Sequence, residues 1–189
     1  MNVKILRLAG FFGVTAPLLC FFMVLTVISL SPWFSWYSNA LSDLGVGDFS
    51  SVIFNSGLAM TGSLMMMFSI GPYELFRESM VGKMGAFLFL ASALFLIGIG
   101  IFNETFGSIH FYVSLGFFVS LILSLLILGV SFSIKRMTGF SILSLLAGTA
   151  GAMVWLLPWD GAAIPEAVST LAAGVWSSVL GVWMLRLKE

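Results

Sequence analysis

Long apolar runs separated by short polar stretches dominate the pattern of this sequence. A membrane-spanning α-helix needs about 20 predominantly apolar residues, because each residue advances the helix by about 1.5 Å. Six runs meet this length, at about 8–30, 51–71, 83–102, 109–133, 138–157 and 164–185. We expect Gly71-Pro72 to end the second run, because proline lacks the N–H group that a helix interior uses. The pattern predicts an all-α fold, a compact bundle of six transmembrane helices that forms one domain over residues 1–189.

The composition excludes a soluble protein. Hydrophobic residues make up 60% of the chain and charged residues 8%, with a mean hydropathy of +1.12, whereas about 25% of residues are charged in soluble domains. The formal net charge is zero, so we expect no nucleic acid as a partner. The apolar composition makes membrane lipids the expected partners. The first run lacks a small-residue cleavage site, and we expect it to remain as a transmembrane helix. Its single cysteine, Cys20, is expected to serve packing.

The basic residues predict the orientation of the bundle. If the six helices alternate in direction, all eight lysine and arginine residues fall on one side of the membrane: Lys4, Arg7, Arg77, Lys83, Lys135, Arg136, Arg186 and Lys188. Cytoplasmic loops of membrane proteins carry an excess of lysine and arginine. We therefore expect a multi-pass protein of the cell membrane with both termini in the cytoplasm.

Polar and acidic residues gather at the opposite, non-cytoplasmic edge. Ionisable and amide groups near a bilayer are costly, and for that reason they mark candidate functional positions. The candidates are Asn39, Ser42, Asp43, Asn55, Glu104, His110, Ser114 and Glu166. His110 and Ser114 are four residues apart and share one helix face. Because alternating helices bring these ends to one depth, we expect a polar, acidic pocket at this edge.

Simpler roles remain open for several of these residues. Ser42 or Asp43 would cap or turn the chain, as short polar side chains do before helices. Glu166 follows Pro165 at a helix start, where a negative charge suits the helix dipole. His110 would be a solvated histidine at the membrane interface.

The same residues carry a resemblance to a known family. They are Asn39-x-x-Ser42-Asp43-Leu44-Gly45, Phe54-Asn55-x-Gly57-Leu58, Gly100-Ile101-Phe102-Asn103-Glu104 followed by Ile109-His110, and Pro165-Glu166 with Trp176. In this order they resemble, over essentially the whole chain, a prokaryotic membrane family catalogued as domain of unknown function nine-nine-eight. The resemblance implies a six-helix archaeal or bacterial membrane protein with a Ser-Asp, His and Glu set, and it brings no established activity. The chain departs from the family at Phe102-Asn103, where the family shows Phe-Pro.

Three functions fit these residues, and we favour the binding or carrying of an amphipathic, lipid-like ligand or a cation. The ligand-binding candidates are Asn39, Asn55, Glu104, Ser114 and Glu166. Carboxylates would attract a polar head group or a cation, and amides and hydroxyls would hydrogen-bond to it. The apolar bundle would accommodate a lipid or prenyl tail.

The second hypothesis is an intramembrane hydrolase or transferase that acts on a lipid. Ser42 would be the nucleophile, His110 the base, and Asp43 or Glu166 the carboxylate that orients the histidine. In a metal-dependent form, His110 and two or three of Asp43, Glu104 and Glu166 would hold a metal that activates water. The chain has one histidine, which excludes zinc held by three histidines and haem held by two within one chain.

The third hypothesis is an accessory subunit of a larger membrane complex, or a subunit of a homo-oligomer. The small size of the chain and its lack of a soluble domain permit this role. No feature of the sequence selects a particular partner.

Overall fold

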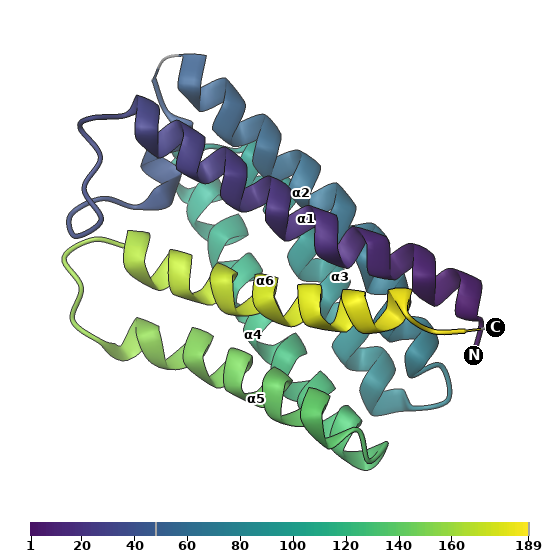
Figure 1. The fold of residues 1–189 in the computed structure, drawn as a ribbon. Coiled ribbons are helices and arrows are strands. Elements are labelled where there is room, and N and C mark those ends of the chain that lie inside the picture. The colour runs from purple at the N-terminus through teal and green to yellow at the C-terminus, as the bar shows by residue number, and fades with distance from the viewer. Residues whose placement is uncertain (48, 189) are drawn as a thin grey trace.

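The computed structural model describes residues 1–47 and 49–188, which form a bundle of six α-helices without strands (Figure 1). The helices are α1 (Val3–Leu30), α2 (Phe49–Leu75), α3 (Met80–Ile101), α4 (Ser108–Ile134), α5 (Thr138–Met153) and α6 (Ala163–Leu185). Three short 3-10 helices lie between them: η1 (Leu41–Gly45), η2 (Glu104–Phe106) and η3 (Val154–Leu156). The all-α, six-helix fold class predicted from the apolar runs is confirmed.

All six helices, with η3 continuing α5, are long and apolar enough to cross a membrane. The outer surface of the bundle is apolar as well: Leu18, Phe22 and Leu146 are 64%, 74% and 63% exposed. Such a surface is compatible with lipid and unfavourable in water. The chain is therefore a multi-pass membrane protein.

The close contact of α1 with α6 depends on two glycines. A Cβ atom on Gly10 would lie 2.6 Å from the carbonyl oxygen of Gly181, and one on Gly181 would lie 2.7 Å from that of Gly10. Apolar surfaces gain little from each other in lipid, so small residues that allow backbones to approach are a main source of helix association. Beside this contact the core is aromatic, with the fully buried Trp176 packed against Phe68 and Phe89.

The predicted end of the second helix at Gly71-Pro72 is wrong, since α2 continues to Leu75 with Pro72 inside it. Tertiary packing explains the difference. Gly71 is buried against α1 and α6, where a Cβ atom would lie 2.9 Å from Ala9 and from Met184. The carbonyl of Pro72 still accepts a hydrogen bond from the N–H of Phe76 at 3.0 Å. The missing N–H of Pro72 thus costs one hydrogen bond, and packing keeps the last turn helical.

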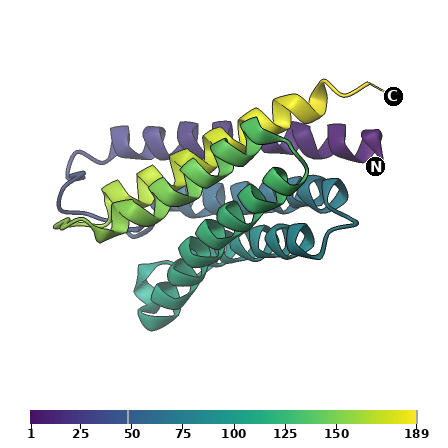
Figure 2. The ribbon, with the colours of Figure 1, turned by 90° about the horizontal axis from the view of Figure 1, so that it is seen from below.

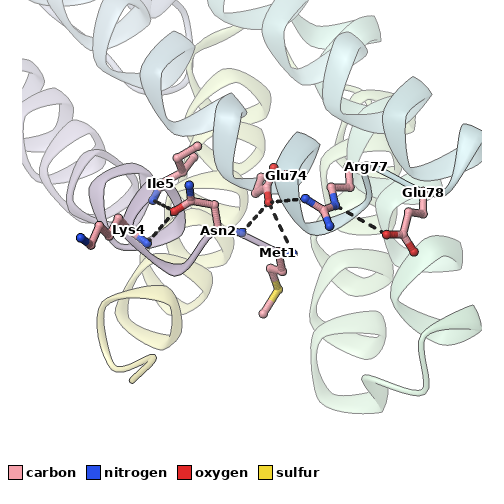
Figure 3. Close-up of polar contacts among 7 residues, drawn as sticks. All are labelled: Met1, Asn2, Lys4, Ile5, Glu74, Arg77 and Glu78. Carbon is pink, nitrogen blue, oxygen red and sulfur yellow. Dashed lines mark hydrogen bonds and ion pairs between the residues drawn. The ribbon is translucent and has the colours of Figure 1, made fainter. Parts of the chain in front are cut away.

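The two ends of the bundle differ in character. Both termini lie together at one end, while the α1–α2 and α5–α6 connections lie at the other (Figures 1 and 2). We call the end with the termini the basic end, and the end that holds η1, η2 and Glu166 the acidic end. At the basic end, Glu74 on α2 accepts a hydrogen bond from the backbone N–H of Asn2 at 2.5 Å and pairs with Arg77 at 3.6 Å (Figure 3).

Candidate ligand-binding site

The polar residues before η1 order their own turn. Asn39 Nδ2 donates to Asp43 Oδ2 at 2.7 Å, and the backbone N–H of Ala40 donates to the same oxygen at 3.0 Å. Asn39 Oδ1 in turn accepts a hydrogen bond from the N–H of Ser35 at 2.9 Å. Asp43 therefore acts locally as a cap. The side chains of both predicted site residues, Asn39 and Asp43, form hydrogen bonds that stabilise this loop.

Two carboxylates from distant parts of the chain hold η1 from either side. The backbone N–H of Leu41 donates to Glu166 Oε2 on α6 at 2.6 Å. The hydroxyl of Ser42 donates to Glu104 Oε1 on η2 at 2.7 Å. Three of the predicted site residues, Ser42, Glu104 and Glu166, are thus brought together around one turn of chain.

The carbonyl of Gly45 is a third attachment point. It accepts hydrogen bonds from Asn55 Nδ2 on α2 at 2.8 Å and from Asn103 Nδ2 at 3.2 Å. A Cβ atom at position 45 would lie 2.6 Å from Asn55 Oδ1, so only glycine lets the two groups approach this closely. Asn55 therefore fixes η1 onto α2.

His110 forms a separate pair with Ser114 at the start of α4. Its Nδ1 lies 2.7 Å from the carbonyl oxygen of Phe102. Because a carbonyl can only accept, Nδ1 carries the hydrogen. Its Nε2 lies 3.3 Å from Ser114 Oγ. The serine-hydrolase hypothesis needs Ser42 to donate to His110, whereas in this structure Ser42 donates to Glu104.

The pKa of Glu104 is influenced by burial and by the neighbouring Asp43. Burial raises the pKa of Glu104 above its ordinary value of 4.5, and the neighbouring Asp43 raises it further. The hydrogen bond from Ser42 and the electrostatic influence of the nearby His110 act in the opposite direction without overcoming the rise. Glu104 therefore takes up a proton more readily than an exposed glutamate does.

The predicted metal ligands do not form a recognisable metal site. Within residues 1–47 and 49–188, no group of three or more histidine, cysteine, aspartate or glutamate side chains is arranged to hold a metal ion. His110 is engaged with Phe102 and Ser114, and Asp43 with the turn before η1. Both side chains are thus already engaged within the protein.

Inside the bundle, a cavity of about 140 Å³ lies next to η1. Its walls are mostly apolar side chains of α1, α2, α3, α4 and α6, among them Leu58, Phe117 and Leu121. Ser42, Ser114 and Glu166 also line it. On the other face of η1, Asn39, Asp43 and Glu104 line an open depression of the surface. The 3-10 helix η1 therefore lies between an acidic surface and an apolar cavity. Ser42 lines the cavity and is hydrogen-bonded to Glu104 at the surface.

The cavity itself could not be predicted, because five helices contribute to its walls and no spacing along the chain reveals their contact. The backbone groups of Leu41, Gly45 and Phe102 were missed for the same reason. Every residue has such groups, and only the fold shows which ones a side chain reaches.

Comparisons with known proteins place the chain next to one family. A family model described as "Protein of unknown function (DUF998)" matches residues 14–183. The match includes the whole site, from Asn39 to Glu166. No curated protein and no solved structure matches the chain.

Proposed function

This chain belongs to the DUF998 family of proteins of unknown function, and we propose that it binds an amphipathic ligand at the acidic end of its bundle. The polar head of the ligand contacts Ser42 and Glu166, and its apolar part enters the cavity. One observation carries the proposal: Ser42 and Glu166 are members of the hydrogen-bonded cluster around η1 and also line the apolar cavity. A ligand with one polar and one apolar end matches both environments.

The acidic side chains define the chemistry of the head group. An ionised carboxylate only accepts hydrogen bonds, and three carboxyl groups, those of Asp43, Glu104 and Glu166, lie around η1. A head group that carries an amine or several hydroxyls supplies donors and, for the amine, a compensating charge. A purely anionic head group is repelled. We therefore expect an amine- or hydroxyl-bearing amphipath.

Loss of bound lipid in Glu166→Gln tests the proposal. The protein is purified in mild detergent, and the lipid that remains bound is extracted and quantified by mass spectrometry per mole of protein. Glutamine keeps an oxygen that accepts the hydrogen bond from the Leu41 N–H, so η1 stays attached while the carboxyl group is replaced by an uncharged amide. We expect about a tenfold loss of the amine- or hydroxyl-bearing lipid, the size of one charge-assisted hydrogen bond.

The matched control is Glu78→Gln, which makes the same chemical change on an exposed side chain at the basic end. It should retain the lipid of the wild type. Equal lipid contents in the wild type and Glu166→Gln, or a wild type that retains no amphipath, would overturn the proposal.

We infer further that the acidic end faces away from the cytoplasm of the cell, with both termini inside. The support is the position of all eight lysine and arginine residues in the helix ends and connections of the basic end. In a Cys20→Ala background, a membrane-impermeant maleimide applied to intact cells should label Asp160→Cys and leave Glu78→Cys unlabelled. Labelling of Glu78→Cys alone would reverse the orientation.

A further inference from the structure

Thr61 on α2 is an exception among the hydroxyl groups that line the cavity. The other four form hydrogen bonds within the protein: Ser42 with Glu104, Ser92 with the Phe89 carbonyl, Ser114 with His110, and Thr170 with the Glu166 carbonyl. Thr61 is 2% exposed, and its Oγ1 has no hydrogen-bond partner among the residues that the structure describes. A buried hydroxyl without a partner calls for an explanation.

The Thr61 hydroxyl does not donate to a backbone carbonyl of α2, although other hydroxyls on this helix do. Other hydroxyls on α2 donate to a carbonyl three or four residues earlier: Ser56 to Val52, Ser63 to Ala59 and Ser69 to Met66. Thr61 departs from this pattern and lines the cavity. Its hydroxyl is therefore available to a molecule inside the cavity.

A water molecule is a poor partner at this position. A buried water typically makes two to four hydrogen bonds to polar groups. The thiol of Cys20 is the polar group closest at hand and interacts with the Thr61 hydroxyl. A thiol is only a weak donor and acceptor, so this contact does not replace a full hydrogen bond. An organic group that contacts apolar walls and offers one oxygen fits this environment better than water does.

The volume of the cavity limits the size of that group. At about 140 Å³ it is close to an engineered apolar cavity of about 150 Å³ that stays dry and binds benzene. A single ring therefore fills a space of this volume. Thr61 lies six residues inward from Asn55, the residue that is hydrogen-bonded to η1, which corresponds to about 9 Å along the helix.

We propose that the cavity binds a neutral, ring-sized apolar group that carries one hydrogen-bonding oxygen, and that Thr61 recognises this oxygen. Cyclic alcohols, phenols and ring ketones belong to this class. The inference rests on the proposed function, in which the ring is the inner part of the amphipathic ligand. It adds a second polar contact, about 9 Å along α2 from Asn55, which distinguishes this ligand from a simple fatty acyl lipid.

Two probes of matched size test the proposal on the full-length protein in detergent. Cyclohexanol and methylcyclohexane have the same number of heavy atoms and differ in one hydroxyl. Binding is followed by the rise in Tm, after correction for partition of each probe into detergent. It is also followed by protection of Cys20, the single cysteine of the chain, from alkylation by N-ethylmaleimide. We expect the wild type to prefer cyclohexanol about fivefold, as one net hydrogen bond provides.

The variant Thr61→Val has nearly the same shape and lacks the hydroxyl, so it should bind both probes equally. Thr61→Ser keeps the hydroxyl and should keep the preference. Equal Tm shifts from the two probes in the wild type, or an unchanged preference in Thr61→Val, would overturn the inference.

The failure of this inference can be told apart from the failure of the proposed function. Glu166→Gln should lower the amount of bound lipid and leave the preference for cyclohexanol intact, because Glu166 does not contact the oxygen near Thr61 in this scheme. If Glu166→Gln retains its lipid while Thr61→Val loses the preference, the ring-binding cavity stands and the head-group proposal falls.

Discussion

The hydroxyl of Ser42 donates a hydrogen bond to Glu104 Oε1 at 2.7 Å, between residues separated by 62 positions in the sequence. This bond connects η1, between the first two helices, to η2, between the third and fourth. It also connects a residue that lines the cavity to one that lines the acidic surface depression. This hydrogen bond therefore joins two connections of the acidic end and holds one wall residue of the cavity in place.

Removal of this hydrogen bond by Ser42→Ala should destabilise the protein. Glu104 is half-buried and would lose its hydroxyl donor, which costs about 1–3 kcal/mol of unfolding free energy. The Tm in detergent should fall accordingly. Ser133→Ala, at an exposed position near the basic end of α4, is the control and should leave the Tm unchanged. A Ser42→Ala protein as stable as the wild type would show that the hydrogen bond contributes nothing net.

Glu104 should make stability depend on pH. Its pKa is raised in the folded state above the ordinary value of 4.5, so the folded state binds this proton more tightly than the unfolded state does. The resulting stabilisation is fully present below about pH 4.5 and is lost as the pH rises through the folded-state pKa. Glutamine does not titrate, so the Tm of the wild type should fall relative to that of Glu104→Gln as the pH rises across that window.

The measurement is a series of Tm values from pH 4 upward for the wild type, Glu104→Gln and Glu78→Gln. The exposed Glu78 serves as the control, and its variant should follow the wild-type curve. Parallel curves for the wild type and Glu104→Gln would contradict the raised pKa.

The fold could be predicted because each helix carries its own signal. A run such as 109–133 is predominantly apolar and contains no aspartate, glutamate, lysine or arginine, so no long-range contact is needed to recognise it. Position 72 is different, because proline disfavours a helix interior and the local sequence therefore predicts that the helix ends there. The observed continuation of α2 depends on how Gly71 packs against α1 and α6. Long-range packing outweighs local preference there.

The candidate site could be predicted only in outline. Alternating helix direction is enough to bring Ser42, Glu104 and Glu166 to the same end of the bundle. It does not say that Glu166 accepts from the backbone of Leu41, nor that Ser42 is paired with Glu104 and not with His110. Those choices depend on the path of a short loop, which the apolar pattern leaves undetermined. The role of Thr61 depends in the same way on a cavity that only the assembled helices create.

Gly45→Ala should loosen η1 from α2. The added Cβ would lie 2.6 Å from Asn55 Oδ1, so either η1 or Asn55 must move and the hydrogen bond to the Gly45 carbonyl must weaken. Overpacking of this kind costs about 1–3 kcal/mol, and the Tm should fall. Gly139→Ala is the control, because a Cβ at that position meets nothing within 4 Å and alanine favours the helix. Equal Tm values for the two variants would show that the Gly45 contact is not tight in solution.

Thr61→Val should have the opposite effect and stabilise protein from which bound lipid has been removed. The wild type buries a hydroxyl that has no partner among the described residues, and valine replaces it with a methyl group of similar size. The removal of one unsatisfied polar group should raise the unfolding free energy by about 1 kcal/mol. Thr149→Val repeats the substitution at an exposed position of α5, and it should change the Tm less. A fall in Tm for Thr61→Val would mean that the hydroxyl has a partner in the lipid-free protein, and the cavity would then have no unpaired group to offer a ligand.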